Sequence, residues 1–434
     1  MLVLSAAARL EGSRPDAAPL TGWSSRALRA LWTVTLVGLA IRLGWLLVAQ
    51  PAAVSDALGY TSLAERWVDQ GLYERFDQPT AWRTPGYIVF LAFGLVWSDS
   101  ELWLGWWSVL ASATVVPLVA MLSRQLGLTE RGAIVAAGLA AVMPPLVLWA
   151  PVLGPENVQA PLLLGALVLA AHPDRSARTA RWSGVAFGVA VLVRPESLVY
   201  LPVVAAVMWP GDLRAVLRRT AVIVAVAAAV CTPWVVRNQL QVGPVGLSST
   251  GGVNFYLAHR EDGYGFEHYE YTALAGLSEA EMSRHGYELG FASLSDSPFR
   301  LVGDVAAGTR SLYGEPRYAP YYSTRDFGTR GPYPLGVPEW VVAAARTYNR
   351  LGWMAITMLG VVGWATLVAR RHRAALTLTG MALANWLCFA VVFFALARYR
   401  FPIEPFVCIA AAVALVGGSR ALGVSGVRRR ATTG

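Results

Sequence analysis

Two carboxylates of this sequence stand beside long apolar stretches, where an uncompensated charge is costly. Asp56 lies a few residues after the first apolar stretch, and Glu156, followed by Asn157, lies in an otherwise apolar turn between two later stretches. A carboxylate in such a place can take a proton from an attacking hydroxyl. Each also stands where a helix is expected to begin, so each can instead be a first-turn charge favoured by the helix dipole.

Arginines stand at the ends of other apolar stretches. Arg194 and Glu196 flank a proline between two short stretches, and they can pair with each other as a structural ion pair. Arg237 follows the next stretch, and Arg398 and Arg400 stand between the last two. Arginine binds phosphate bidentately, so this set suits an anionic ligand. Together with a carboxylate base, it suits a lipid-phosphate leaving group that the arginines stabilise.

The composition indicates that membrane helices must position these side chains. The chain has 434 residues, of which 55% are hydrophobic and only 15% are charged, and its mean hydropathy is +0.46. A soluble domain usually has about a quarter of its residues charged. Because the apolar residues come in long blocks, a bilayer must solvate most of this surface. We expect an all-α integral membrane protein, a polytopic helical bundle.

The basic balance of the chain has a membrane explanation. The net charge is +9, and every basic side chain is an arginine because the sequence contains no lysine. The arginines cluster in short turns between apolar blocks, which is the positive-inside pattern and argues against nucleic-acid binding. Cys231, Cys388 and Cys408 all lie inside apolar blocks, so neither a disulfide framework nor a zinc site is predicted.

About ten membrane spans are predicted from the apolar blocks. Their approximate ranges are 27–49, 102–122, 132–148, 158–171, two short spans between 182 and 209, and 221–236, 351–368, 374–396 and 401–415. With the N-terminus in the cytoplasm, the arginine-rich turns 124–131, 175–181, 211–219 and 370–373 and the C-terminal tail all fall on the cytoplasmic side. The two short spans either cross the membrane or form a re-entrant pair, and the parity is the same either way.

This topology divides the chain into regions. We expect a cytoplasmic tail over 1–26, an N-terminal catalytic membrane module over 27–236 with a first outer loop at 50–101, and an extracytoplasmic loop over 237–347. C-terminal membrane helices follow over 348–417, then a basic cytoplasmic tail over 418–434. No cleavable signal peptide is expected, since the first apolar block is too long for one.

The outer loops carry their own helix signals. An apolar stripe over 56–70 predicts an amphipathic helix that stops at Gly71, and the aromatic-rich stretch 86–97 predicts an interfacial helix. Ser278 and Glu281 form a capping-box pattern. Ser297 followed by Pro298 predicts the start of another helix that runs to about residue 313.

In order along the chain, these groups resemble the GT-C superfamily of polyprenyl-phosphate-sugar-dependent membrane glycosyltransferases. The chain looks most like bacterial relatives of the protein O-mannosyltransferases and of the lipid A aminoarabinose transferase. The resemblance covers nearly the whole chain. It rests on Asp56 with Tyr60, the run from Arg83 through Pro85 and Gly86 to Tyr87, Pro155-Glu156, Arg194-Pro195-Glu196, the run from Pro233 to Asn238, the run from Ser249 to Asn254, and Arg398-Tyr399-Arg400-Phe401-Pro402.

The resemblance implies roles for these residues. It makes Asp56 the general base and Glu156 the supporting carboxylate. The substrate-binding residues that it implies are Tyr60, Arg83, Tyr87, Arg194, Glu196, Arg237, Asn238, Arg398 and Arg400. It requires no cofactor but leaves a divalent metal open, because some relatives depend on one. Many relatives carry paired acidic residues in the first loop, whereas this chain has Ser55 before Asp56, and this puts metal dependence in doubt.

The implied function is transfer of a sugar from a polyprenyl-phosphate donor to a glycan, lipid or protein acceptor. Transfer would take place on the extracytoplasmic face of the bacterial plasma membrane, with inversion at the anomeric carbon. The soluble C-terminal domain of some relatives is not expected here, so the loop 237–347 would recognise the acceptor. The alternative is a transporter or flippase for a lipid-linked sugar, which would use the same arginines but no base. A transporter should show polar residues near the bilayer midplane and often internal repeats, and the sequence has neither clearly.

Overall fold

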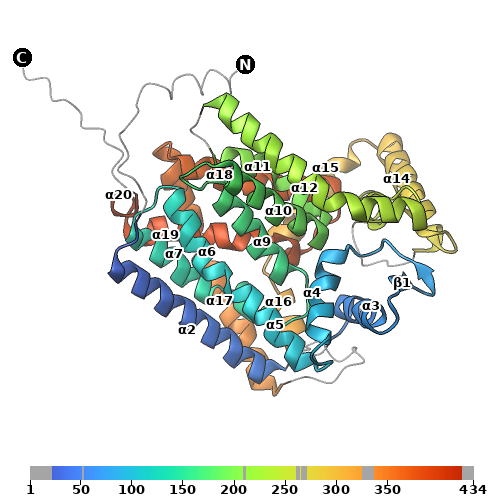
Figure 1. The fold of residues 1–434 in the computed structure, drawn as a ribbon, viewed down its shortest axis with the longest axis horizontal. Coiled ribbons are helices and arrows are strands. Elements are labelled where there is room, and N and C mark those ends of the chain that lie inside the picture. The colour runs from blue at the N-terminus through green and yellow to red at the C-terminus, as the bar shows by residue number, and fades with distance from the viewer. Residues whose placement is uncertain are drawn as a thin grey trace, which may run out of the picture.

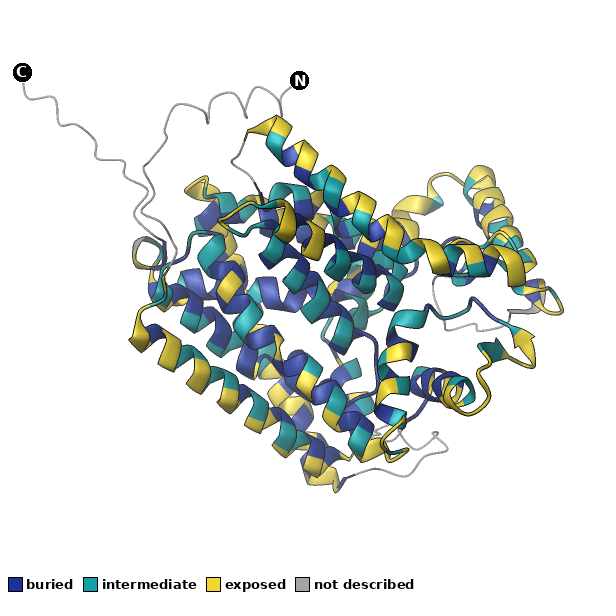
Figure 2. Cartoon of the chain, in the orientation of Figure 1, coloured by how far each residue is buried: buried dark blue, intermediate teal, exposed yellow. Residues whose placement is uncertain are grey.

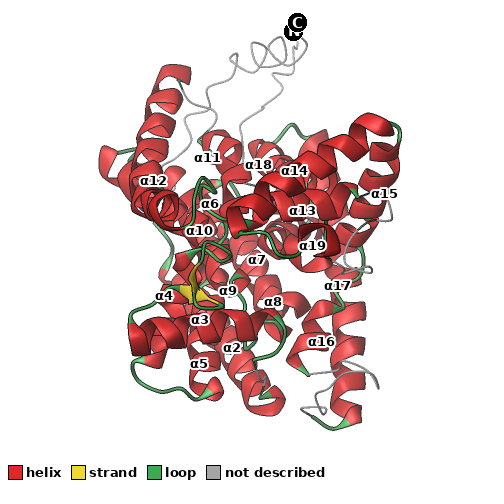
Figure 3. Ribbon diagram, turned by 90° about the vertical axis from the view of Figure 1, so that its right-hand side faces the viewer, coloured by secondary structure: helices red, strands yellow, loops and turns green. Residues whose placement is uncertain are grey.

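The computed structural model shows a bundle built almost wholly of helices (Figure 1, Figure 3). It describes residues 22–50, 53–208, 212–260, 264, 271–324 and 337–422, so most of both expected tails lies outside the described residues. The structure is 78% helical. Within the described ranges, the paired strands β1 (Glu74–Arg75) and β2 (Gln78–Pro79) form one small antiparallel hairpin. The predicted all-α membrane class is confirmed.

Among the described residues, six helical segments are long and apolar enough to cross a bilayer. They are α2 (Ser25–Ala49), α5 with α6 (Glu101–Ala113, Val115–Gln125), α12 (Leu213–Gln241), α17 (Glu339–Ala369), α18 with η4 (Arg373–Trp386, Leu387–Val392), and η5 with α19 (Ala397–Ile403, Glu404–Val416). A helix of about 20 residues spans the hydrocarbon core of roughly 30 Å. The chain is therefore a multi-pass membrane protein.

Shorter helices lie at the positions of the other four predicted spans. They are α7 (Glu130–Val142), α8 (Pro144–Leu148), α9 (Glu156–Ala170), α10 (Ala177–Val193), η1 (Pro195–Tyr200) and α11 (Leu201–Ala206). Together η1 and α11 extend only about 20 Å, which is short of the hydrocarbon thickness. The predicted ninth span is also shorter than expected, because the helix ends at Val392 and the residues after it are extended.

A buried arginine stabilises the break between α7 and α8. The helix α7 ends at Val142 because Pro144 cannot continue it and leaves carbonyl groups without helical partners. Arg42 of α2, which is fully buried, donates to the carbonyl oxygens of Ala140 at 3.0 Å and Ala141 at 3.1 Å. An unpaired carbonyl inside a membrane costs several kcal/mol, so this contact holds two spans together.

The bundle has an inner set and an outer set of helices (Figure 2). In the outer helices α2, α12 and α17, only 17–22% of the most apolar 18-residue window is buried inside the protein, whereas in η5 with α19 the share is 78%. Large apolar side chains such as Trp32, Leu36 and Val361 are exposed on the outer helices and are left to face lipid. The buried helices α9, α10 and α19 therefore form the interior on which the site is built.

The arginine-rich turns meet at one end of the bundle. Arg373, at the start of α18, donates to the carbonyl of Leu126 after α6 at 3.2 Å, and Arg219 of α12 donates to the carbonyl of Ser176 before α10 at 3.1 Å. These contacts place the turns that follow α6, α9, α11 and α17 on the same side. The opposite ends of the same helices must then gather on the other side.

Most helices of the two long loops lie at that other end, toward the right of Figure 1, whereas α16 lies nearer the middle of the picture. The first loop contains α3 (Asp56–Gln70), the hairpin and α4 (Pro85–Leu95). The second contains α13 (Thr250–His259), η3 (Tyr271–Leu274), α14 (Glu279–Asp296), α15 (Arg300–Tyr313) and α16 (Tyr318–Ser323). The short α20 (Gly418–Ala421) follows α19.

Three helix signals of the outer loops can be compared with these bounds. The helix α3 has the predicted range, and it ends at Gly71 with φ of 70°, a conformation that glycine adopts readily. The capping box of Ser278 and Glu281 is present at the start of α14. The prediction for Ser297 was wrong: this residue ends α14, and α15 begins at Arg300 because two turn residues intervene.

Candidate active site

Four helix ends bring charged side chains to the loop-bearing end of the bundle. Asp56 begins α3 soon after α2 ends, and Glu156 begins α9. Arg194 follows the last residue of α10, where Pro195 stops the helix, and Arg398 lies in η5. Outgoing helices end here and incoming helices begin here, so residues far apart in the sequence become neighbours.

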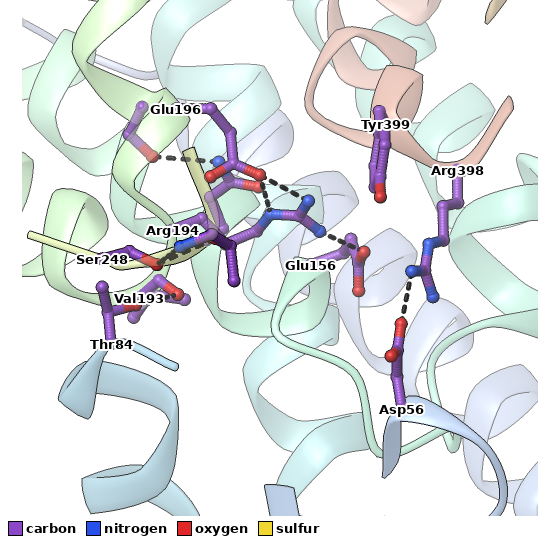
Figure 4. Close-up of polar contacts among 12 residues, drawn as sticks. Asp56, Thr84, Glu156, Val193, Arg194, Glu196, Ser248, Arg398 and Tyr399 are labelled. Atoms are coloured by element: carbon purple, nitrogen blue, oxygen red, sulfur yellow. Dashed lines mark hydrogen bonds and ion pairs between the residues drawn. The ribbon is translucent and has the colours of Figure 1, made fainter. Parts of the chain in front are cut away.

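Two arginines bind Asp56. Arg83 donates from Nη2 to Oδ1 at 2.7 Å, and Arg398 binds Oδ2 (Figure 4). The Arg83 guanidinium also lies over the ring of Tyr60, 4.5 Å from its centroid. Burial opposes the charged carboxylate, but the charges of Arg398 and Arg83 outweigh it and hold the pKa of Asp56 well below its usual range. Asp56 is therefore an anion at every physiological pH.

A second cluster lies beside the first. Arg194 binds Glu156 and donates from Nε to Glu196 at 2.7 Å. Glu156 is almost fully buried, whereas Glu196 is 19% exposed. Figure 4 shows Glu156 between Arg194 on one side and the Asp56–Arg398 pair on the other. Three arginines and three carboxylates thus form one compact network with balanced charge.

Tyr399 joins the two clusters, and the sequence analysis gave it no role of its own. Its ring centroid lies 5.0 Å from the guanidinium carbon of Arg194 and 5.4 Å from that of Arg398. Cation–π contacts of this kind hold guanidinium groups in place without neutralising them. The only signal was its position between Arg398 and Arg400 in the sequence.

Close backbone packing positions the first loop against α10. Thr84 donates from Oγ1 to the carbonyl of Val193 at 3.1 Å. A Cβ on Gly86 would lie 2.6 Å from the Val193 backbone nitrogen, so only glycine fits there. This contact fixes Arg83, just before it, relative to Arg194, just after Val193.

The second loop holds the segment that leads to Arg398. The backbone N–H of Ala395 donates to the Tyr264 hydroxyl at 2.6 Å, and Ser311 donates to the Ala395 carbonyl at 2.7 Å. His259 contacts the carbonyl of Val392 through Nε2 at 3.2 Å. Residues 392–395 are therefore fixed by α13 and α15, and these helices set the position of Arg398.

Three predicted substrate-binding residues lie in other contacts. Arg237 donates to the carbonyls of Thr80 at 2.6 Å and Tyr73 at 3.0 Å, and so fastens the first loop. Asn238 donates to the carbonyl of Gly246 at 2.9 Å.

The third of these, Arg400, is buried and donates to Glu404 at 2.9 Å and to the carbonyl of Leu312 at 2.8 Å. Most polar groups of these three side chains are bound by the protein itself, although Nη2 of Arg400 has no partner among the described residues. Their contacts in this form are structural, and the predicted substrate-binding role stays a prediction.

The charged network surrounds a small pocket that has no room for a water-sized molecule in this form, so a substrate can enter only if side chains move. Its lining comprises Glu156, Gln159, Arg194, Glu196, Tyr200, Phe389, Arg398, Tyr399 and Pro402. No group of three or more His, Cys, Asp or Glu side chains that could hold a metal occurs within the part of the chain that the structure describes.

Both the sequence and the fold of this chain match known proteins. The family described as dolichyl-phosphate-mannose-protein mannosyltransferase matches residues 83–236, about a third of the chain. The crystal structure of the apo oligosaccharyltransferase from Archaeoglobus fulgidus matches with a TM-score of 0.54 and 14% identity, over 90% of this chain and 50% of that chain. The chain therefore shares the fold of this oligosaccharyltransferase.

Two further solved structures match this chain. The A. fulgidus oligosaccharyltransferase AglB, in complex with an inhibitory peptide and a dolichol-phosphate, matches with a TM-score of 0.53 and 15% identity, over 91% of this chain and 50% of that chain. ArnT from Cupriavidus metallidurans, bound to undecaprenyl phosphate, matches at 0.41 and 16% identity, over 91% of this chain and 78% of that chain, and we draw no argument from that score.

The chain spans about half the length of the archaeal enzymes that it matches. No curated protein sequence matches it significantly.

Proposed function

We propose that this protein is a glycosyltransferase that moves a sugar from a polyprenyl-phosphate donor to an acceptor hydroxyl. The observation that carries the proposal is the convergence of Arg83, Arg194 and Arg398 around Asp56 and Glu156 at one end of a membrane bundle. Guanidinium groups suit the donor phosphate, and the adjoining membrane helices suit its prenyl chain.

The proposed reaction moves one negative charge through the network. The acceptor oxygen attacks the anomeric carbon while Asp56 takes its proton, and the bond from that carbon to the phosphate oxygen breaks with its electron pair on the phosphate. One negative charge therefore passes from Asp56 to the leaving phosphate. Arg83 and Arg398, which bind Asp56, would then stabilise that charge on the leaving phosphate. A single displacement of this kind inverts the anomeric configuration.

The same contacts limit the basicity of Asp56. A carboxylate whose pKa is held far below about 3.9 is a weak base while both arginines hold it. When Arg398 turns to the donor phosphate, Asp56 keeps only Arg83 and its pKa rises. Donor binding would in this way prepare the base for the acceptor.

The site is proposed to face the extracytoplasmic side. The arginine-rich turns lie at the opposite end of the bundle, and positive turns face the cytoplasm. This orientation puts both termini in the cytoplasm and the loop 237–347, as the acceptor surface, outside the bacterial plasma membrane. A relative with the same fold holds a dolichol-phosphate, which supports a polyprenyl-phosphate donor.

The test is transfer from radiolabelled decaprenyl- and undecaprenyl-phosphate sugars in membranes that contain the protein. Asp56→Asn should abolish transfer while the protein remains folded by size-exclusion chromatography. Asp77→Asn is a matched control, because Asp77 lies in the same outer loop, is highly exposed and pairs with Arg66. Activity that survives Asp56→Asn would remove the base assignment. Translocation of a labelled lipid without transfer in any variant would favour a flippase instead.

A further inference from the structure

Several buried polar atoms of the described residues have no hydrogen-bond partner, and three of them lie on side chains beside the charged network. They are Oε2 of Glu156, Nε1 of Trp149 and the hydroxyl oxygen of Tyr87. All three side chains are more than nine-tenths buried, and Tyr87 is fully buried. A buried polar group without a partner costs about 1–3 kcal/mol, so three together at one place require an explanation.

The first two atoms converge on one point. A Cβ built on Gly154 would lie 2.8 Å from Oε2 of Glu156 and 3.0 Å from Nε1 of Trp149. The Trp149 ring is held by its neighbours, since its centroid lies 5.1 Å from that of Tyr318. Its backbone is held as well, because the side-chain amide of Asn157 donates to the Trp149 carbonyl at 2.9 Å. These contacts hold Trp149 in place beside Glu156.

Tyr87 approaches the same carboxylate from α4. Burial, followed by the nearby Glu156 carboxylate, raises the pKa of the Tyr87 hydroxyl well above its usual value. This hydroxyl is therefore a proton-bearing donor at neutral pH. Its ring packs edge-on against Tyr60, with centroids 5.1 Å apart, and Tyr60 in turn contacts Arg83. Tyr87 thus lies near Glu156 and packs on the tyrosine that contacts Arg83.

These atoms combine one anionic acceptor with two neutral donors. A phosphate would be repelled by Oε2 of Glu156, whereas a sugar hydroxyl can donate to Oε2 and accept from Trp149 or Tyr87 at the same time. Aromatic rings beside such groups offer the apolar surface that the faces of a sugar ring need. With the phosphate held by the arginines, the sugar attached to it would reach Oε2 of Glu156.

We propose that Glu156, Trp149 and Tyr87 form the subsite that binds the hydroxyl groups of the donor sugar, and that this subsite selects which sugar is transferred. The inference rests on the proposed function. It assigns Trp149 a specificity role and gives the free oxygen of Glu156 a ligand, while the other oxygen stays with Arg194.

The experiment compares two ligands in purified protein reconstituted in nanodiscs. One is undecaprenyl phosphate without a sugar, and the other is the sugar-bearing donor that the wild-type protein uses. Trp149→Phe and Tyr87→Phe each remove one donor and keep a ring. Each should raise KM for the sugar-bearing donor by roughly 3- to 10-fold, and leave competition by bare undecaprenyl phosphate unchanged. Trp103→Phe is the control, since its Nε1 already donates to the carbonyl of Gly94 at 3.0 Å, outside the site.

Synthetic donors that lack single hydroxyl groups give a second readout. The wild-type protein should discriminate against at least one deoxy donor, and Trp149→Phe or Tyr87→Phe should lose most of that discrimination.

Unchanged KM and unchanged discrimination in both variants would overturn the subsite while leaving the transferase intact. Equal weakening of bare undecaprenyl phosphate would also overturn it, because the residues would then act on the phosphate. A wild-type protein that neither binds nor uses any lipid-linked sugar would overturn the proposed function and the subsite together.

Discussion

Arg398 and Arg400 are two residues apart and chemically identical, yet the structure predicts opposite phenotypes for their substitution. Arg398 contacts Asp56, which is 35% exposed and keeps Arg83 as a second partner. Arg400 contacts Glu404, and both side chains are at most 3% exposed. The matched pair Arg398→Gln and Arg400→Gln therefore separates a residue of the site from a residue of the core.

The expected magnitudes follow from these surroundings. Removing Arg398 from a partly solvated pair should cost about 1 kcal/mol of stability or less. It should lower kcat/KM about 10²- to 10³-fold, as the loss of one contact to a developing oxyanion does. Removing Arg400 leaves Glu404 buried without its partner, which should cost about 3–5 kcal/mol. Activity per folded molecule should then change little.

The assay measures both quantities in one preparation. Thermal half-life in detergent, followed by fluorescence-detected size-exclusion chromatography, reports stability, and transfer from labelled donor is normalised to the folded fraction. Half-life is the appropriate measure because membrane proteins often unfold irreversibly. A stable Arg400→Gln protein with low specific activity, or an unstable but fully active Arg398→Gln protein, would refute the reasoning.

Three further outcomes follow from contacts elsewhere. Arg42→Leu should shorten the thermal half-life strongly, because the carbonyls of Ala140 and Ala141 lose their partner inside the membrane. Arg346→Leu, on an exposed face, is the comparison. An unchanged half-life of Arg42→Leu would contradict the prediction. His372 caps α18 by accepting from the Ala374 N–H, and burial lowers the pKa of His372 to about 4. The free energy of unfolding should therefore be full above pH 6.5 and decline between pH 6.5 and 4. In a pH series of melting temperatures, His372→Asn should flatten this decline. Arg237 binds the carbonyls of Tyr73 and Thr80, so Arg237→Gln should speed proteolytic cleavage within residues 73–82. Competition by bare undecaprenyl phosphate should not weaken. An unaltered rate of digestion would contradict this structural role.

Local signals in the sequence were sufficient for several helices. The range of α3 follows from an apolar stripe closed by glycine, and the start of α14 follows from a capping box, because both depend on residues within one or two turns. The break between α7 and α8 also has a local signal, the two prolines at the start of α8. The apolar block 132–148 is nevertheless long enough to be read as one continuous span, so its length alone does not reveal the break.

The site could be predicted only as a set of candidates. Arg237, Arg398 and Arg400 have the same side chain and similar apolar flanks, and only tertiary packing decides which guanidinium faces Asp56. Trp149 stood at the end of a predicted span, where a tryptophan is typical of the membrane interface. Nothing in the neighbouring sequence indicates that its N–H lacks a partner.

The hold of α13 and α15 on residues 392–395 restricts how enzymes of this architecture can diversify. Under the proposed function, a new acceptor surface on those helices would also move the backbone that carries Arg398, so donor binding and acceptor choice would change together. Exchanging residues 250–313 with those of a relative should therefore lower donor affinity unless 390–400 is exchanged with it. In such a lineage the two segments would be inherited as one unit.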